Sequence, residues 1–538
     1  MKKRSGMIFF IGFIFFIGSI SGAAGGLQAP QQKPAAQAEA AAKSSPAAPP
    51  PPEKPLAVTR HTVTIGGRPI AFTATVGTLT VIKRDETPGA NIFFMAYTRD
   101  GIKDLSARPV TFVFNGGPGS SSVWLHMGGM GPRRVLMTDE GFPVKPPYGL
   151  TDNENSLLDV TDLVFIDPVS TGYSRPLPGE DKSQFHGVAE DIASVGEFIR
   201  LYVTRNERWA SPKFILGESY GTTRAAGLSG YLQGGTMGMY LNGIVLVSSV
   251  LDFQTITFMP GNNLAYALFL PHYAATAWYH KKLTPELQAK PLKDVLKEAE
   301  DFAAGEYWTA LFQGNRLPKE EAEKIAAKLA AFTGLSWEYV AQSNLRVRHD
   351  RFVKELLRTD LETVGRLDSR FKGRDADAAG ENYEFDPTSA AIQGPFSTMF
   401  NTYVRTELGY KEDLPYAIYG NVYPWNFMSR PEEAEQTPGM PSRGRAGRLG
   451  GLNVAETLRS AMSENPFLRV FVANGYYDGA TPYFGTEYTF SQIGLNGEFE
   501  GRVRMGYYEA GHMMYIHKPS IIKLKQDLAE FIAAASAK

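Results

Sequence analysis

The feature that most constrains the fold of this chain is the pentapeptide Gly-Glu-Ser-Tyr-Gly at 217–221, which follows a short strand-like stretch at 213–216 with apolar residues at 214–216. A buried strand that ends in a G-x-S-x-G turn and continues into a helix leaves the serine hydroxyl exposed at the tip of the turn. The two glycines permit the tight reversal, and small residues such as Thr222 and Ala225 follow it. The pattern predicts a nucleophile elbow with Ser219 at its tip.

Short apolar runs recur along the chain and are typical of strands that are buried on both faces. They lie at 110–114, 163–166, 214–216, 244–247, 468–473 and 503–508. Helical patterns lie between them, the clearest at 188–205, and alternating residues at 58–97 indicate hairpins. Because strands and helices alternate, we expect an α/β fold with a mostly parallel central sheet.

A segment without such strands divides this pattern. We expect 253–445 to be a mainly helical insertion, or lid, between a first core part at 56–252 and a second at 446–538. Helical spacing rich in Ala, Glu and Lys extends over 287–312, 319–331 and 337–358. A charged, glycine-bearing stretch at 366–380 is expected to form a surface loop.

The N-terminus reads as a targeting segment followed by a spacer. Basic residues at 2–4, an apolar stretch at 7–20 and small residues at 21–23 predict a secretory signal peptide over 1–23. The apolar stretch is shorter than the roughly 20 residues of a membrane span, although an uncleaved anchor is the alternative. The Ala- and Pro-rich segment 24–55 predicts a disordered linker. We therefore expect an exported protein, periplasmic or secreted, without stable membrane insertion after cleavage.

Charge and cysteine content exclude several classes of function. The net charge is −1 and the pI about 6.7, whereas nucleic-acid-binding proteins usually carry a basic surplus. The chain has 0 cysteines, so it has no disulfide, no thiolate nucleophile and no thiolate metal site. We expect no metal, no organic cofactor and no nucleic-acid partner.

A serine nucleophile needs a base, and the base needs a group that orients it. In α/β-hydrolases the chain order is serine, acid, histidine. His512 follows the strand at 503–508 and is the preferred base, with His517 as the weaker candidate. Asp478 follows the strand at 468–473 and is the preferred acid, with Asp252 as its rival after the strand at 244–250.

Acyl transfer also needs hydrogen-bond donors for the developing oxyanion. The amide of Tyr220, directly after Ser219, can supply one donor. The second is expected from the loop Asn-Gly-Gly-Pro-Gly-Ser-Ser-Ser at 115–122, where glycines let bare amides approach a substrate. This loop lacks the lysine and Ser/Thr pair of a phosphate-binding P-loop.

Five blocks of sequence together resemble the serine carboxypeptidases. They lie at 115–122, 165–174, 217–221, 474–478 and 511–513, in the family's order. The blocks fall within residues 112–514, although the insertion between them matches no family motif. One departure is Ser120, because the family commonly has cysteine there. The resemblance implies an α/β-hydrolase fold and release of C-terminal residues from peptides.

The resemblance also implies a role for each residue of the site. It makes Ser219 the nucleophile, His512 the general base and acid, and Asp478 the orienting acid. Gly117 and Tyr220 would supply the oxyanion amides. The substrate's terminal carboxylate would be bound by Asn115, Gly116 and Glu218.

A glutamate that faces a carboxylate repels it unless the two share a proton. With a shared proton the pair becomes a strong hydrogen bond. We therefore expect peptides to be cleaved best below neutral pH, while blocked esters lose less activity as the pH rises. The alternative for Glu218 is a structural ion pair with Arg224.

The leading hypothesis is an exported serine carboxypeptidase that acts on peptides. The first alternative is an esterase or acyltransferase that uses the same triad, because the shape of the pocket and not the fold decides the acyl group. The second is a non-catalytic binding protein on a hydrolase scaffold. The intact set of Ser219, Asp478 and His512 argues against the second alternative.

Overall fold

The computed structural model describes residues 53–83, 85–235, 237–428, 451–494 and 496–537. The predicted signal peptide at 1–23 lies outside these residues, as do all but the last three residues of the predicted linker. None of the described helices combines the length and the apolar character needed to cross a bilayer.

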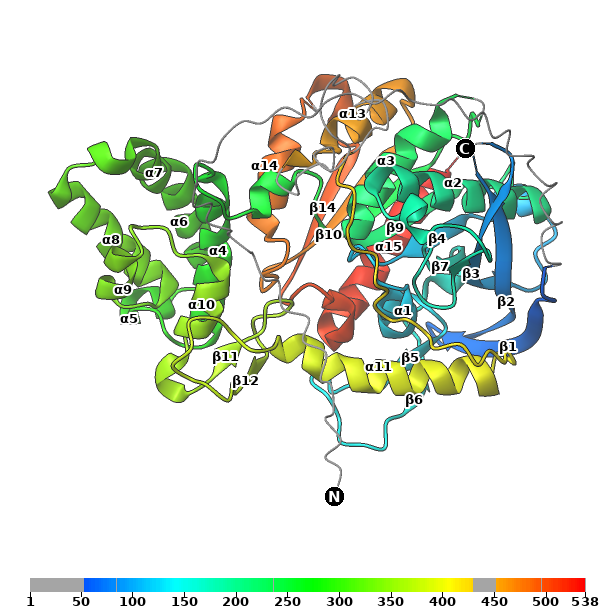
Figure 1. Ribbon diagram of the computed structural model, residues 1–538, viewed down its shortest axis with the longest axis horizontal. Coiled ribbons are helices and arrows are strands. Elements are labelled where there is room, and N and C mark those ends of the chain that lie inside the picture. The colour runs from blue at the N-terminus through cyan, green and yellow to red at the C-terminus, as the bar shows by residue number, and fades with distance from the viewer. Residues whose placement is uncertain (1–52, 84, 236, 429–450, 495, 538) are drawn as a thin grey trace, which may run out of the picture. The chain divides into compact units, whose positions relative to one another are not determined.

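One mixed sheet forms the centre of the described chain from residue 53 onward (Figure 1). Its strand order is β1-β2-β3-β7-β4-β9-β10-β13-β14, and β8 pairs with β3. The strands are β1 (Ala57–Ile65), β2 (Arg68–Ile82), β3 (Pro88–Arg99), β4 (Val110–Phe114), β7 (Asp162–Ile166), β8 (Arg175–Pro176), β9 (Lys213–Ser219), β10 (Gly243–Ser249), β13 (Arg469–Gly475) and β14 (Val503–Tyr508).

The sheet is antiparallel at one side and parallel at the other. β1, β2, β3 and β7 pair antiparallel, whereas the run from β7 through β4, β9, β10 and β13 to β14 is parallel. Every residue of β4, β7 and β10 is buried, as their continuous apolar runs predict. The predicted fold class, an α/β-hydrolase fold with a mostly parallel central sheet, is confirmed.

Helices cover both faces of this sheet and fill the insertion. Apolar side chains of α2, α3 and α13 pack on one face, and those of α1, α11 and α15 on the other. The helices are α1 (Val123–Leu125), α2 (Val188–Arg205), α3 (Tyr220–Gln233), α4 (Leu264–Tyr279), α5 (Pro285–Gln288), α6 (Leu292–Phe302), α7 (Trp308–Gln313), α8 (Lys319–Thr333), α9 (Trp337–Gln342), α10 (His349–Glu355), α11 (Pro387–Thr406), α13 (Ala455–Glu464), α14 (Tyr483–Gln492) and α15 (Lys518–Ser536). Two small ribbons pair β5 (Arg133–Val135) with β6 (Leu150–Asp152) and β11 (Thr363–Val364) with β12 (Lys372–Gly373).

The helices from α4 to α10, which follow β10, have a hydrophobic core of their own. In Figure 1 they gather beside α14. Two long helices expected there are wrong: 287–312 is broken before Pro291, which precedes α6, and 337–358 divides into α9 and α10. The predicted end of the insertion at 445 falls among residues that the structure does not describe, so that boundary stays a prediction.

The stretch at 366–380 is not simply a surface loop. Asp368, Ser369 and Arg370 are only 1%, 0% and 4% exposed. Their charges suggested solvent, but they pack against the loops that follow β13 and β14, and the two charges satisfy each other in an ion pair of 2.6 Å. Contacts between such distant parts of the chain leave no local signal in the sequence.

Candidate active site

The turn between β9 and α3 has the geometry of a nucleophile elbow. Ser219 is the last residue of β9 and has φ 60° and ψ −131°, a conformation that costs energy for any residue other than glycine. A Cβ at Gly217 would lie 2.2 Å from the carbonyl oxygen of Gly221, so only glycine fits there. The strained turn presents Ser219, which is partly exposed, at the carboxyl end of the strand.

The glycine loop after β4 lies directly against this elbow. A Cβ at Gly116 would be 2.4 Å from the amide nitrogen of Tyr220 and 2.6 Å from the carbonyl oxygen of Glu218. Gly117 has φ 106°, a conformation that glycine adopts readily. The structure thus brings the loop that carries the predicted oxyanion donor Gly117 into contact with the residue that carries the other donor.

Asp478 and His512 form a hydrogen-bonded pair, 2.8 Å between Oδ2 and Nδ1. The carboxylate of Asp478 also accepts hydrogen bonds from the amides of Ala480 (2.8 Å) and Thr481 (3.0 Å) and from the hydroxyl of Thr481 (2.8 Å). Burial alone would raise the pKa of Asp478, but His512 and these donors outweigh it, and the pKa is lowered. Asp478 is therefore held as a carboxylate.

The imidazole of His512 is buried, and its main chain is fixed on two sides. Its amide donates to the carbonyl of Leu367 (2.7 Å), and its carbonyl accepts from the hydroxyl of Ser248 (2.7 Å). Burial opposes protonation of His512, but the charge and hydrogen bond of Asp478 raise its pKa above the ordinary value. Glu218 raises the pKa of His512 further, and the positive charge of Arg366 opposes the rise.

The three predicted catalytic residues come from the carboxyl ends of neighbouring parallel strands. Ser219 ends β9, Asp478 follows β13, and His512 follows β14. Between them lies the end of β10, where Ser249 pairs with Ser219 and the adjacent Ser248 bonds His512. Ligand sites of open α/β sheets form at this edge.

Glu218 lies under the elbow and is 4% exposed. Burial raises its pKa to about 7, although the nearby His512 and a 2.5 Å hydrogen bond from the Tyr515 hydroxyl oppose the rise. The suggested ion pair with Arg224 is wrong, because Arg224 pairs with Asp191 at 2.7 Å. Glu218 therefore has no cationic side chain of Arg or Lys as a partner among the described residues.

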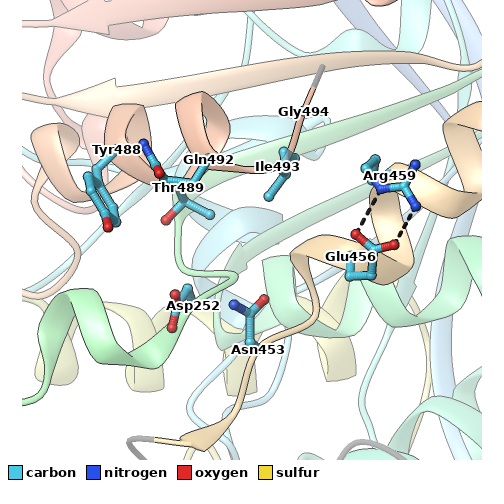
Figure 2. A pocket seen from close by; sticks show the side chains of 9 residues that line it. All are labelled: Asp252, Asn453, Glu456, Arg459, Tyr488, Thr489, Gln492, Ile493 and Gly494. Carbon is cyan, nitrogen blue, oxygen red and sulfur yellow. Dashed lines mark hydrogen bonds and ion pairs between the residues drawn. The ribbon is translucent and has the colours of Figure 1, made fainter. Parts of the chain in front are cut away.

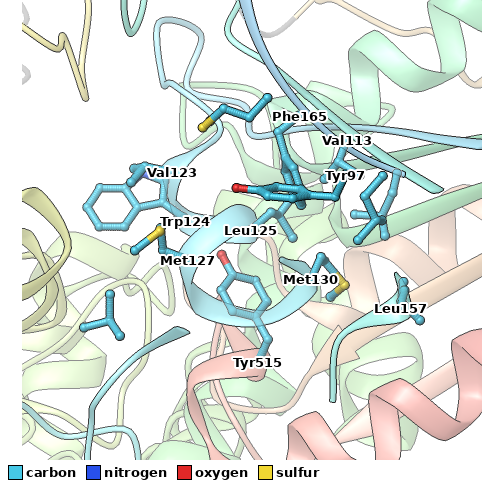
Figure 3. Close-up of a cluster of buried hydrophobic side chains, with 14 of the residues drawn as sticks. Tyr97, Val113, Val123, Trp124, Leu125, Met127, Met130, Leu157, Phe165 and Tyr515 are labelled. Atoms are coloured by element: carbon cyan, nitrogen blue, oxygen red, sulfur yellow. The ribbon is translucent and has the colours of Figure 1, made fainter. Parts of the chain in front are cut away.

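Sequence reasoning missed Tyr515, which contacts Glu218 directly. It is completely buried beside the segment 123–130, and Figure 3 shows it close to Met127 and Met130. A Cβ at Gly128 or Gly129 would lie 2.6 Å from its side chain, so these glycines make room for it. Its position three residues after His512 is the only hint in the sequence, and no motif marks it.

Asn115, which is predicted to bind the substrate carboxylate, is also buried, and the oxygen of its side-chain amide is already hydrogen-bonded. Its Oδ1 accepts from the amide of Leu125 at 3.0 Å. Its Nδ2 is buried and makes no hydrogen bond of regular geometry among the described residues, although Asn115 lies close enough to Glu218 to lower the pKa of that carboxyl group. A buried donor without a partner costs free energy, roughly 1–3 kcal/mol, and favours an arriving acceptor.

The alternative acid, Asp252, and the alternative base, His517, each form hydrogen bonds with residues close in sequence. Asp252 accepts from the amide of Gln254 (2.9 Å) and lines a surface pocket of about 580 Å³ together with Asn453 and Thr489 (Figure 2). His517 precedes α15 and bonds the hydroxyl of Ser520 at 2.8 Å. In the described part of the chain no group of three or more His, Cys, Asp or Glu side chains is placed to hold a metal ion.

Residues 68–268 match the family model described as serine carboxypeptidase. This part of the chain is therefore similar to the serine carboxypeptidases. The matched residues include the glycine loop and the elbow but not Asp478 or His512. A comparison with curated proteins finds no match.

Solved structures of hydrolases are similar to this chain. The Kex1(Δ)p prohormone-processing carboxypeptidase of Saccharomyces cerevisiae has a TM-score of 0.52 at 15% identity, covering 86% of this chain and 91% of that one. At that identity the likeness shows the fold alone. A proline iminopeptidase of Mycobacterium smegmatis matches with a TM-score of 0.35 at 13% identity, covering 86% of this chain and 99% of that one. A monoglyceride lipase of Saccharomyces cerevisiae also has a TM-score of 0.35, at 10% identity, covering 86% and 96%.

Proposed function

We propose that this protein is an exported carboxypeptidase that releases C-terminal amino acids through an acyl-enzyme on Ser219 and works best at acidic pH. The observation that carries the proposal is the buried Glu218, whose pKa is raised to about 7 beside the elbow. A carboxyl group that keeps its proton in mildly acidic solution can donate it to a substrate carboxylate. The signal-like segment at 1–23 supports export.

In the first step Ser219 Oγ attacks the carbonyl carbon of the last peptide bond, and His512 Nε2 takes the hydroxyl proton. Asp478, bonded to Nδ1 at 2.8 Å, fixes the tautomer that makes this possible and stabilises the imidazolium. The amides of Gly117 and Tyr220 donate to the oxyanion. When the carbon–nitrogen bond breaks, His512 returns the proton to the leaving amine.

In the second step a water molecule attacks the acyl-enzyme, and His512 again takes and returns one proton. The ester bond to Ser219 breaks, the peptide leaves as a carboxylic acid, and the serine regains its proton. Acylation and deacylation thus use the same base and the same oxyanion donors.

Three groups would hold the terminal carboxylate of the substrate. Protonated Glu218 and the Nδ2 of Asn115 would donate hydrogen bonds to it, and so would the amide of Gly116. The hydroxyl of Tyr515 donates to Oε2 of Glu218, which leaves Oε1 as the oxygen for the shared proton. Ionisation of Glu218 above about pH 7 would place two negative charges together and weaken binding.

The test is the release of leucine from Z-Phe-Leu between pH 4 and 8 by the wild type and by Ser219→Ala. Z-Phe-Leu amide, which lacks the terminal carboxylate, is the matched control substrate. We expect the wild type to release leucine from Z-Phe-Leu, fastest below pH 7, and to cleave Z-Phe-Leu amide little. Ser219→Ala should release no leucine. Ester hydrolysis that needs Ser219 without any leucine release would instead support the esterase or acyltransferase alternative.

A further inference from the structure

A short segment of the insertion, residues 366–369, contacts both catalytic loops, and we call it the clasp. The amide of Ser369 donates to the carbonyl of Tyr477 at 3.0 Å, and the amide of Gly479 donates to the carbonyl of Arg366 at 3.0 Å. These two bonds bracket Asp478 on either side. The clasp therefore fixes the main chain immediately before and after the proposed orienting acid.

The same segment holds the loop that carries His512. The amide of His512 donates to the carbonyl of Leu367 at 2.7 Å, and the amide of Gly511 donates to Oδ2 of Asp368 at 3.0 Å. A Cβ at Gly511 would lie 2.4 Å from the Cβ of Asp368, so the loop can reach the clasp only with glycine at that position. Two consecutive amides of the base loop thus end on the clasp.

Asp368 is itself held firmly. Its carboxylate forms a buried ion pair with Arg370, in which each side chain is 2% exposed. The hydroxyl of Thr388, on α11, donates to the carbonyl of Asp368 and accepts from its amide, both at 3.1 Å. A charge that is fixed in this way gives the amide of Gly511 a strong acceptor at a defined place.

We propose that Asp368 is a positioning residue for catalysis: through Gly511 it holds the His512 loop against Asp478, so that the helical insertion completes the catalytic apparatus. This inference rests on the proposed roles of His512 and Asp478. An error of about 1 Å in the placement of a catalytic group can reduce the rate by about 100-fold. Loss of the Asp368 carboxylate would free the Gly511 amide and let the loop move.

The experiment compares Asp368→Asn with Asp375→Asn. Asp375 forms the matched buried ion pair of the insertion, with Lys354, and these side chains are 1% and 2% exposed. The other bonds of its carboxylate go to Thr363 and to the amide of Glu384, and among the described contacts none reaches a catalytic loop. Both variants remove one buried charge from the insertion, but only Asp368→Asn changes the bond to Gly511.

The readouts are kcat and KM for a blocked ester, the pH profile of kcat/KM, and Tm. We expect Asp368→Asn to lower kcat about tenfold or more with little change in KM, whereas Asp375→Asn changes kcat less than twofold. In Asp368→Asn the acidic limb of the kcat/KM profile should also move to lower pH. A displaced His512 loses part of the rise in its pKa that Asp478 causes. Glu218, which raises this pKa, and Arg366, which lowers it, are unchanged in both variants. Equal losses of kcat in the two variants, or an unchanged Asp368→Asn enzyme, would overturn the proposal.

A milder variant keeps the proposal testable if Asp368→Asn does not fold. Thr388→Val removes the hydroxyl that brackets Asp368 but keeps the ion pair with Arg370. We expect a smaller fall in kcat together with a modest fall in Tm, because the buried amide of Asp368 loses its acceptor. An unchanged kcat would contradict the role of the clasp. If ester hydrolysis needs Ser219 but no peptide is cleaved, the carboxypeptidase proposal fails while the prediction for Asp368 stands.

Discussion

Glu218 and Asp478 are both carboxyl groups at the same edge of the sheet, and both are buried, at 4% and 0% exposure. Their pKa values nevertheless move in opposite directions. Burial dominates at Glu218, where it raises the pKa to about 7. At Asp478 burial acts in the same sense, but His512 and the donors of residues 480 and 481 outweigh it.

The difference lies in the partners of each carboxyl group and not in the depth of burial, and at Asp478 the charge of His512 counts most. Asp478 accepts from two amides, one hydroxyl and the imidazole of His512, whereas Glu218 accepts from the hydroxyl of Tyr515 and is otherwise stabilised only by the side chain of Asn115 and the more distant charge of His512. A carboxylate replaces its lost hydration with donors, and a carboxyl group with few donors keeps its proton instead. One site thus holds one permanent anion and one acid, which suits the two tasks proposed for them.

The largest effect is expected from Asp478→Asn, because an amide cannot stabilise the imidazolium and favours the wrong tautomer of His512. We expect kcat for peptide and ester to fall about 10⁴-fold. Asp252→Asn is the matched control and should change kcat little, since Asp252 caps a local turn. A larger loss in the Asp252 variant would reverse the assignment of the acid.

Glu218→Gln tests the other carboxyl group. The amide can donate a hydrogen bond to a substrate carboxylate at any pH, so the loss of peptide cleavage above about pH 7 should disappear, while kcat/KM at pH 5 falls about tenfold. Stability offers a check that is independent of activity. Because the folded-state pKa of Glu218 is raised above the ordinary 4.5, its contribution to wild-type stability is full below 4.5 and is lost as the pH rises to about 7. The Tm of the wild type should therefore fall relative to the variant over that interval, and parallel Tm curves would contradict it.

Tyr515→Phe should widen the difference between the pKa values of Glu218 and Asp478. The hydroxyl of Tyr515 favours the ionised form of Glu218, so its removal raises the pKa of Glu218 further. We expect the alkaline limb of peptide cleavage to move upward by about one to two pH units, since one hydrogen bond to a charged group is worth about 1.5–3 kcal/mol and one pKa unit corresponds to about 1.4 kcal/mol. A shift of this limb to lower pH would mean that the Tyr515 hydroxyl stabilises the protonated form of Glu218 instead.

The smallest effect is expected from Arg366→Met. The charge of Arg366 opposes protonation of His512, so its loss should raise the pKa of His512 and move the acidic limb of ester hydrolysis to higher pH by a few tenths of a unit. The backbone bond between Arg366 and Gly479 does not depend on the side chain and should survive. A limb that stays in place would mean that solvent screens this charge completely.

The parts of the site that follow local rules could be predicted from the sequence. The predicted elbow coincides with the turn at Ser219, because the glycines that flank it are required by contacts within a few residues. The predicted helix at 188–205 coincides with α2, and the order of the buried runs gives the positions of Asp478 and His512 after their strands. Short-range sterics and the period of the apolar residues are sufficient for these elements.

The remaining parts depend on contacts between distant residues. Asp368 looks like one charge among many in a polar stretch, and only the fold shows that it meets Gly511. Tyr515 forms a hydrogen bond with Glu218, 297 positions earlier in the sequence, and no local pattern encodes this contact. The break in the helix expected at 287–312 differs from these, because Pro291 is visible in the sequence and marks it.

The contact between Leu367 and His512 has a consequence for the order in which the site forms during synthesis of the chain. Domains fold from the N-terminal side as a chain is synthesised, and contacts between distant residues form late because closing long loops costs entropy. Ser219 is therefore available long before His512, near the end of the chain, can reach its partner. A nascent chain in which Ser219 has folded but His512 has not yet been synthesised carries a nucleophile without its base, so we expect it to have no hydrolytic activity.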